Sequence, residues 1–263
     1  MQWERKVTIV TGGASGIGAA CCRNFAARGA KVVVADLNGD GAKAVAAEFG
    51  GLGVGCNVGN EDEVNALVKA AEDHYGPVDI FFNNAGINSG REILNTPLSV
   101  WDDHWQVNVM AHVYAVRAVL PGMLERGSGY LIHTASMAGI LMSNGNLPYT
   151  VSKHAVVGLA EYLSVTHHHQ GIRVSLLAPL GVRTPMLGDP GKPFAHNAVG
   201  PVKEPEEVAE MVARAVEDER FLILTDDLAQ KWMEGKTNDI ERWLRGMRRL
   251  AEKIEAEGGR DPG

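Results

Sequence analysis

The chain has 263 residues, of which 45% are hydrophobic, and its formal net charge is −7. This length and composition suit one large α/β domain with a full-sized core, with two small domains as the less favoured alternative, and the acidic balance argues against nucleic acid as the main partner. Residues 1–6 lead directly into a strand-like run, so no signal peptide is expected, and no apolar run is judged long enough to span a membrane. Three cysteines, two of them adjacent, favour a reducing, cytoplasmic compartment.

Apolar strand-like runs alternate with helical patterns along the chain. Strands are predicted at 6–11, 31–36, 52–58, 78–83, 130–136, 172–179 and 221–225, and helices at 16–28, 40–49, 60–75, 99–126, 149–169 and 205–218. Continuous apolar strands interleaved with helices indicate βαβ units and a parallel sheet covered on both faces. The irregular stretch 181–201, rich in Gly and Pro, is typical of a lid or binding loop.

The chain continues for nearly forty residues after the last predicted strand. Ile240, Trp243, Leu244, Met247, Leu250 and Ile254 recur there at helical spacing. Such a helix packs on its own subunit or a partner, closes over the substrate loop, or lies on a membrane surface, which the interspersed glutamates disfavour. We expect one domain over 1–226 with a substrate loop at 180–203, followed by a helical extension over 227–263 that is not an independent domain.

A glycine-rich loop, Thr11-Gly-Gly-Ala-Ser-Gly-Ile-Gly18, lies between the first strand and the first helix. Glycines allow a tight turn and a close approach to a pyrophosphate, and the helix N-terminus offers free N–H groups. Asp36 ends the second strand, where an acid accepts hydrogen bonds from the adenosine ribose and repels a 2′-phosphate. Since neither Ser15 nor Leu37 is basic, NAD is favoured over NADP. The expected contacts in this loop are Gly12, Ser15, Gly16, Ile17 and Gly18.

Tyr149 and Lys153 stand four residues apart, just inside the start of an apolar helix that follows Pro148. Residues i and i+4 share one face of a helix, so the two side chains are predicted to be neighbours. A Tyr-x-x-x-Lys pair is common, and by itself it indicates only a helix start with two amphipathic side chains. The other motifs in the sequence decide whether this pair indicates a catalytic site.

Six motifs in order make the chain resemble the short-chain dehydrogenase/reductase superfamily, in its single-domain NAD-dependent form. They extend from Lys6 to Met186 and are Thr11-Gly-x-x-x-Gly-Ile-Gly18, Asn83-Asn-Ala-Gly86, Trp101 seven residues before Asn108, Ser136 thirteen before Tyr149, Tyr149-x-x-x-Lys153, and Pro179 to Thr184. The resemblance implies a doubly wound, Rossmann-type, seven-stranded parallel sheet of order 3-2-1-4-5-6-7, flanked by helices. Its ligand would lie at the carboxyl ends of the strands, where the order reverses.

The resemblance assigns catalysis to Asn108, Ser136, Tyr149 and Lys153. Tyr149 would exchange a proton with the substrate oxygen, with its pKa lowered by roughly two to three pH units by the Lys153 ammonium and the nicotinium of NAD⁺. Ser136 would hydrogen-bond the substrate oxygen, Lys153 would hold the nicotinamide ribose, and Asn108 would hold a water that connects Lys153 to solvent. Taken singly, Ser136 is equally a loop cap, and Asn108 is a buried polar group with a local partner.

The resemblance also implies the remaining cofactor contacts. They are Leu37, Asn57 and Val58 near the adenosine, then Asn84, Ala85 and Gly86 with Asn83 tying neighbouring strands, and finally Pro179, Val182 and Thr184 beside the nicotinamide, together with Tyr149 and Lys153. Two positions depart from the family pattern. Asn57 replaces an acid, although its oxygen still accepts a hydrogen bond. Leu180 replaces a glycine and resists positive φ, which leaves the local path of the loop open.

Together these inferences predict an NAD-dependent oxidoreductase of secondary alcohols or ketones that needs no metal. Ser136, Tyr149, Met142 and Met186 are the expected substrate contacts, in a mainly apolar pocket that suits a steroid, terpenoid, hydroxy-acyl or cyclic alcohol. By resemblance, a homodimer or homotetramer would form through helices 99–126 and 149–169, with no membrane partner. The alternatives are a catalytically idle NAD-binding sensor or scaffold, which the four retained residues disfavour, and a ketoacyl reductase, which typically uses NADPH and which Asp36 disfavours.

Overall fold

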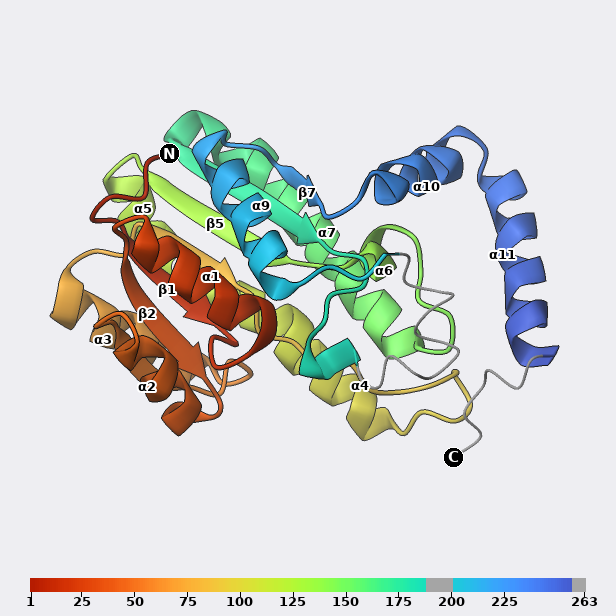
Figure 1. Ribbon diagram of the computed structural model, residues 1–263, viewed down its shortest axis with the longest axis horizontal. Coiled ribbons are helices and arrows are strands. Elements are labelled where there is room, and N and C mark those ends of the chain that lie inside the picture. Colours follow the sequence, from red (N-terminus) through yellow and green to blue (C-terminus); the bar gives the residue numbers. More distant parts are fainter. Residues whose placement is uncertain (188–200, 257–263) are drawn as a thin grey trace.

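The computed structural model describes residues 1–187 and 201–256 (Figure 1). Its strands form one sheet in the order β3-β2-β1-β4-β5-β6-β7, and every neighbouring pair is parallel. The strands are β1 (Val7–Thr11), β2 (Lys31–Asp36), β3 (Leu52–Gly55), β4 (Ile80–Asn83), β5 (Gly129–Thr134), β6 (Ile172–Ala178) and β7 (Leu222–Leu224). The predicted fold class and strand order are confirmed, and the order reverses between β1 and β4.

Helices cover both faces of the sheet, as the continuous apolar strands predict. On one face lie α1 (Gly16–Ala27), α2 (Gly39–Ala47) and α9 (Pro205–Glu217), with α1 and α9 side by side in Figure 1. On the other lie α3 (Glu61–Tyr75), α5 (Ala111–Glu125) and α7 (Leu147–His167). Alternate residues of β2 enter the two cores: Val32 and Val34 face α1, whereas Val33 and Ala35 face the opposite layer.

The predicted helix 99–126 is composite. It begins as α4 (Leu98–Trp105), widens into the π-helical turn η1 (Gln106–Met110) and continues as α5. By length and composition alone, Leu98–Glu125 could cross a membrane, so the expectation that no run is long enough was wrong. In the fold, α5 packs on β4, β5 and α3, which is the position of a core helix in an α/β layer.

The C-terminal extension forms two helices, α10 (Asp227–Asn238) and α11 (Ile240–Ala256). Both helices lie within the predicted helical extension 227–263, although the apolar periodicity was identified only over α11. Figure 1 shows α10 leaving the end of β7 and α11 standing apart from the sheet. Residues 188–200 of the expected substrate loop and 257–263 of the extension lie outside the described residues.

Short helical turns complete the described chain. They are α6 (Met137–Ile140), which follows β5, and the 3-10 turns η2 (His168–Gln170) and η3 (Pro185–Leu187). The turn α6 lies against α7 and β6, so it belongs to the layer that carries the predicted catalytic residues.

Candidate active site

The glycine-rich loop packs too closely for larger side chains. Gly12 and Gly16 have φ of +65° and +50°, and a Cβ on Gly12 would lie 2.9 Å from the Ala85 Cα. A Cβ on Gly18 would lie only 2.1 Å from the Gly12 carbonyl oxygen. Gly18 therefore allows the helix to pack on the loop, and since it is not among the residues that line the cleft, its predicted contact with the cofactor stays a prediction.

The N-terminus of α1 points into a cleft at the carboxyl ends of the strands. Ser15 occupies the N-cap position, yet in the described structure its side chain caps no backbone N–H, and the first turn has no acidic residue. The N–H groups of this turn and the positive end of the helix dipole thus remain available to an anion. This arrangement fits the diphosphate of a dinucleotide.

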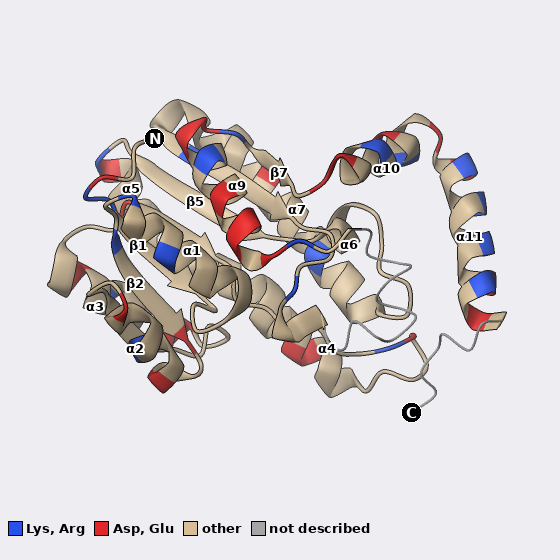
Figure 2. Ribbon diagram, in the orientation of Figure 1, with Lys and Arg blue, Asp and Glu red and all other residues tan. Residues whose placement is uncertain are grey.

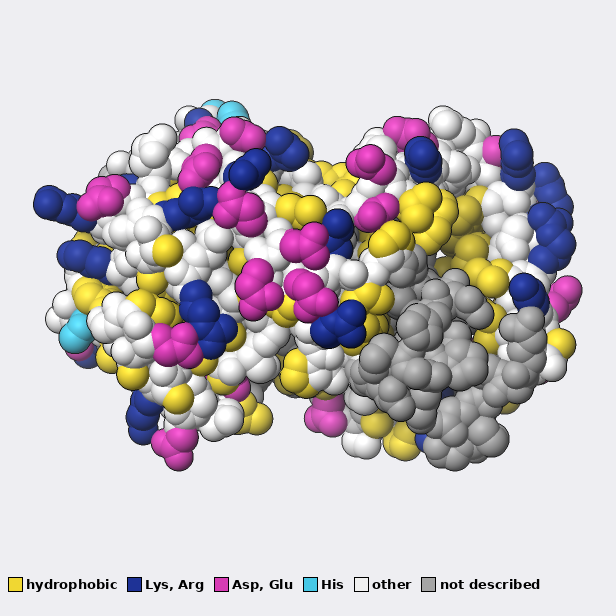
Figure 3. Space-filling model, in the orientation of Figure 1, with side chains coloured by type: hydrophobic (Ala, Val, Ile, Leu, Met, Phe, Trp, Pro, Cys, Tyr) yellow, Lys and Arg dark blue, Asp and Glu magenta, His cyan; other side chains and the backbone are white. Residues whose placement is uncertain are grey.

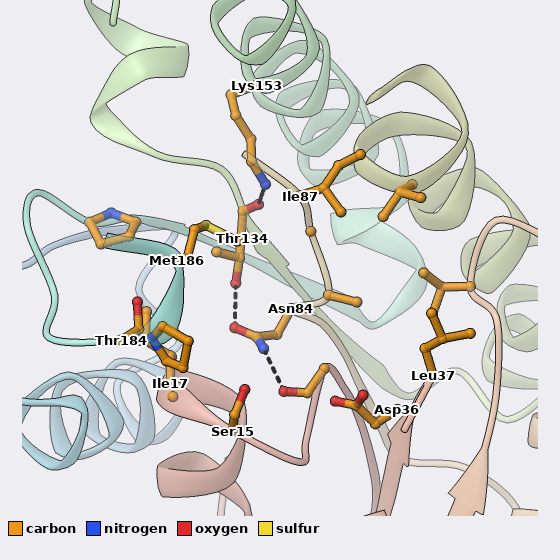
Figure 4. A pocket seen from close by; sticks show the side chains of 18 of the residues that line it. Ser15, Ile17, Asp36, Leu37, Asn84, Ile87, Thr134, Lys153, Thr184 and Met186 are labelled. Atoms are coloured by element: carbon orange, nitrogen blue, oxygen red, sulfur yellow. Dashed lines mark hydrogen bonds between the residues drawn. The ribbon is translucent and has the colours of Figure 1, made fainter. Parts of the chain in front are cut away.

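The cleft has a volume of about 350 Å³ (Figure 4). Except for Gly18 and Val182, every predicted cofactor contact lines it, and Val182 lies instead on the neighbouring pocket described below. Sequence reasoning missed Cys56, Ile87, Val107, Thr134, Ala135 and Pro185. Each of these residues stands within two positions of a predicted one, so extending each motif along its strand end or helix would have found them.

Asp36 is held at the end of β2 by the loop opposite. Its carboxylate accepts hydrogen bonds from the backbone N–H groups of Ala14 at 3.0 Å and Asn38 at 2.9 Å. Among the described residues that line the cleft, the only cation is Lys153, which comes from a different element, α7. The Asp36 end of the cleft therefore favours neutral hydroxyl groups over a phosphate.

Asn57 lines the same cleft as an exposed residue after β3. Its side-chain oxygen accepts a hydrogen bond from the Gly59 N–H at 3.0 Å, and its own N–H donates to Glu63. A carbonyl oxygen has two lone pairs, so the second stays free for the adenine contact that the sequence predicts.

Asn84, rather than Asn83, joins the strands at the centre of the sheet. Its amide nitrogen donates to the Thr11 carbonyl at 3.0 Å. Its amide oxygen accepts from the Thr134 hydroxyl at 3.4 Å (Figure 4). The Asn83 amide nitrogen is buried and has no partner in the described structure. The expected tie thus lies one residue later, because Asn83 continues β4, where successive side chains point to opposite faces.

Lys153 is buried with 2% of its surface exposed, and its Nζ donates to the Thr134 carbonyl at 2.8 Å. Burial lowers the pKa of Lys153 to about 8. Figure 4 shows the ammonium entering the cleft at the end of β5. A Cβ on Gly86 would lie 3.4 Å from this nitrogen, so Gly86 leaves room beside it.

Tyr149 lies beside Lys153 as predicted, with the ammonium 5.7 Å from the centre of its ring. Its pKa is nevertheless raised, because burial outweighs a hydrogen bond with Ser136 that acts in the opposite direction. The expected lowering by Lys153 is therefore absent in the protein alone. The cause is the buried position of the phenol, which disfavours its charged form.

Ser136 follows β5 and begins α6, where its hydroxyl oxygen accepts from the Ala138 N–H at 3.1 Å. It thus caps a helix and also contacts the Tyr149 hydroxyl. The two interpretations of this residue, as a cap and as a functional group, are compatible.

Asn108 is fully buried in the π-helical turn. Its amide oxygen accepts from the Ile87 N–H at 2.8 Å, while its amide nitrogen donates to the Ile87 carbonyl at 3.0 Å and to Ser152 at 3.1 Å. Asn108 does not line the cleft. Its side chain positions the segment after β4 against α7. The predicted contact of Asn108 with a water stays a prediction.

A histidine pair that the sequence did not suggest lies in the layer behind Lys153. His112 of α5 and His133 of β5 are buried, with their Nδ1 atoms 2.9 Å apart. Burial lowers the pKa of both, that of His133 to about 3, so both are neutral at physiological pH. Their proximity arises from the packing of α5 on β5, for which no local signal exists.

A second pocket of about 210 Å³ adjoins the first. The two share Ile17, Tyr149, Pro179, Thr184 and Met186, while Ser136 and Met142 line the second pocket alone. The four predicted substrate contacts are thus together on this pocket. Its outer side comes from the C-terminal helices, through Trp232, Met247, Leu250 and Ile254.

Leu180 fits the loop after β6 without strain. Among the described residues, the non-glycine positions with positive φ are Arg5 and Glu219, so Leu180 does not need the conformation that glycine favours. Its N–H donates to the Thr225 hydroxyl at 3.1 Å, and its side chain packs with Met137 and Ala229. The departure from Pro-Gly therefore leaves Pro179 and Thr184 on the cleft.

Residues 6–192 match the family model described as short chain dehydrogenase. The chain belongs to the short-chain dehydrogenase family. It is 35% identical to 1-deoxy-11-beta-hydroxypentalenate dehydrogenase of Streptomyces exfoliatus, over 92% of this chain and 90% of that one. It is 37% identical to the mitochondrial borneol dehydrogenase of Lavandula x intermedia, over 82% and 85% of the two chains.

The fold comparison agrees with this family assignment. A short-chain dehydrogenase/reductase from Burkholderia phymatum, solved in complex with NAD, superposes with a TM-score of 0.82 at 29% identity, covering 92% of this chain and 96% of that one. As a member of the short-chain dehydrogenase family, the chain is an oxidoreductase by descent.

Proposed function

We propose that the protein is an NAD-dependent dehydrogenase that interconverts a mainly apolar secondary alcohol and its ketone. The observation that carries this proposal is the position of Tyr149 on both pockets, with Ser136 on one side and Lys153 on the other. A proton donor at that junction is reachable from the cofactor cleft and from the substrate pocket at once.

Each polar side chain of the site has its own role in the proposed reaction. Ser136 donates a hydrogen bond to the substrate oxygen, and Tyr149 exchanges a proton with that oxygen. Lys153 holds ribose hydroxyl groups, and the phenolate form of Tyr149, which the protein alone disfavours, would be stabilised once NAD⁺ adds its charge to that of Lys153. NAD, when bound, would supply the hydride acceptor or donor and, in its oxidised form, a positive charge. Asn108 acts as a positioning residue through Ile87 and Ser152.

The raised pKa of Tyr149 has a directional consequence. A protonated phenol is ready to protonate a ketone, whereas alcohol oxidation requires the phenolate and so becomes faster as the pH rises. We therefore expect oxidation to be measured best at mildly alkaline pH.

The preference for NAD rests on Asp36. Its carboxylate is fixed by two backbone N–H groups, and the described lining of the cleft has no cation other than Lys153. A 2′-phosphate would be repelled there, while ribose hydroxyls can donate hydrogen bonds to the carboxylate. The NAD in the related structure from Burkholderia phymatum supports the same choice.

The test is absorbance at the NADH band with NAD⁺ and a panel of secondary alcohols, which borneol heads because a relative is named for it. Tyr149→Phe is expected to lower kcat by about 10²–10⁴-fold and to leave NADH affinity unchanged, because it removes only the acid/base hydroxyl. Tyr75→Phe, which removes a hydroxyl from α3, is the control and should behave as the wild type.

Two other outcomes would replace this proposal. Tight NADH binding with no turnover of any alcohol or ketone would identify the idle sensor or scaffold. Turnover confined to β-ketoacyl thioesters would identify the ketoacyl reductase.

The three cysteines are buried, and burial raises their pKa, so we also propose that they remain thiols in the cytoplasm.

A further inference from the structure

We propose that the C-terminal arm, residues 227–256, is the outer wall of the substrate pocket, and that Lys236 fastens this arm to the turn that carries Ser136. The pocket then selects a compact, uncharged alicyclic alcohol or ketone. This inference rests on the proposed function. It concerns a segment for which the sequence left three roles open.

The arm presents one apolar face to the pocket. Met247, Leu250 and Ile254 follow one another at three- and four-residue spacing on α11, and all three line the second pocket. The arginines at 242, 245, 248 and 249 are exposed on the remaining surface of the helix, and Figure 2 shows the basic residues along α11. In Figure 3, hydrophobic side chains gather over α10 and along α11, around a hollow.

Lys236 of α10 joins the arm to α6. Its Nζ donates to the Ile140 carbonyl at 2.5 Å and to the Leu141 carbonyl at 3.3 Å. These carbonyls are at the C-terminal end of α6, where the last groups of a helix have no helical partner and favour a cation. The same nitrogen lies 5.1 Å from the centre of the Trp243 ring in α11. One ammonium therefore contacts α6 and α11 from α10.

The turn that Lys236 contacts, α6, begins at Ser136. The turn α6 has four residues, begins at the Ser136 cap and ends at the carbonyls that Lys236 contacts. Leu141 and Met142, immediately after it, line the pocket together with Trp232 of α10. Releasing Lys236 would thus move a pocket wall and loosen the turn behind Ser136.

The lining limits the chemistry of the substrate. None of the described residues that line the second pocket is charged, and fourteen of them are apolar, namely Ile17, Met137, Ala138, Leu141, Met142, Pro179, Leu180, Val182, Met186, Leu187, Trp232, Met247, Leu250 and Ile254. A charged substrate would lose its hydration there without gaining an ion pair. The volume of about 210 Å³ is below the roughly 300 Å³ at which drug-sized pockets begin, which favours a compact ring system.

The first experiment measures kinetics of the full chain with borneol, cyclohexanol and 3-hydroxybutyrate. Lys236→Met and Leu250→Asn are each expected to raise KM for borneol about tenfold or more, with a smaller effect on cyclohexanol. Lys236→Met is also expected to lower kcat, because it loosens the turn behind Ser136. The controls are Lys231→Met on α10 and Arg249→Asn on α11, both exposed and outside the pocket lining. Unchanged KM for borneol in both test variants, or efficient turnover of 3-hydroxybutyrate, would overturn the inference.

The second experiment needs no activity. Amide hydrogen exchange of the wild type, Lys236→Met and Lys231→Met is followed over 137–142 and 227–256. Faster exchange in both segments of Lys236→Met alone supports the connection, and unchanged exchange in 137–142 refutes it. If the wild type turns over no alcohol or ketone but exchange responds as expected, the proposed function fails while the attachment of the arm stands.

Discussion

The site holds a buried ammonium, whose charge is costly to remove from water. Lys153 is 2% exposed, and its one hydrogen bond in the described structure goes to a neutral carbonyl oxygen, that of Thr134. Because no carboxylate lines the cleft near it, desolvation is not compensated, and the pKa of Lys153 falls to about 8. The buried charge of Lys153, which can act on the Tyr149 phenol, therefore lowers the free energy of unfolding of the protein without cofactor.

The consequence is a pH-dependent stability with a defined sign. Between about pH 8 and the ordinary lysine pKa of 10.5, the unfolded chain binds a proton at Lys153 that the folded chain does not bind. The free energy of unfolding should therefore rise through this window, by about 3 kcal/mol in total, relative to Lys153→Met. Urea unfolding of both proteins at pH 7, 8, 9 and 10 measures the difference. A difference that stays constant from pH 7 to 10 would contradict the assigned burial.

At the scale of elements, the π-helical turn between α4 and α5 holds Asn108, whose side chain contacts two other parts of the chain. Within it, Asn108 points its amide at both backbone groups of Ile87, which follows the Asn83–Gly86 motif and lines the cleft. π-Turns occur often at functional sites. Here the turn joins the segment after β4 to Ser152 of α7, two elements that the chain separates widely.

Replacing Asn108 should therefore cost more than replacing its partner. Asn108→Ala leaves two partly buried backbone groups of Ile87 without their partners, and we expect a loss of about 2–4 kcal/mol in the free energy of unfolding and weaker NADH binding. Ser152→Ala removes one of the three bonds and should cost about 1 kcal/mol. Urea denaturation and fluorescence titration with NADH measure both effects. Equal losses in the two variants would show that Asn108 does not act through Ile87.

For the molecule as a whole, the outer face of α7 indicates an assembly. Val151, Tyr162 and Val165 are 39%, 65% and 80% exposed on one side of this helix. Gly158 lies among them, and a Cβ there would meet nothing within 4 Å. Trp105 of the adjacent α4 is 47% exposed. An exposed apolar face of this kind is typical of a protein–protein interface, so we propose a homodimer or homotetramer that uses it.

Light scattering tests this proposal directly. The wild type should have two or four times the chain mass of 28.2 kDa, and Tyr162→Glu should raise the dissociation constant about 30-fold or more, because it places a charge at a buried aromatic contact. Glu161→Gln, at the neighbouring exposed position, should leave the assembly intact. A wild type of 28.2 kDa at micromolar concentration would refute the assembly.

The parts of this protein that sequence alone determined are local ones. The period-two burial of β2, the glycines of the loop, the Asp36 strand end and the Tyr149–Lys153 spacing each depend on residues a few positions apart. The strand order was implied by the resemblance to the short-chain dehydrogenase family that the motifs carry. Almost all of the cofactor cleft follows from them, because parallel strands bring their carboxyl ends to one edge of the sheet.

Only the tertiary structure decided what depends on burial and on distant contacts. The raised pKa of Tyr149, the strand tie through Asn84, the π-turn at Asn108 and the histidine pair each arise from packing between layers. The contact of Lys236 with Ile140 spans 96 residues of sequence. No periodicity or spacing encodes such a contact, since it exists only after the sheet, α6 and the C-terminal arm have assembled around one pocket.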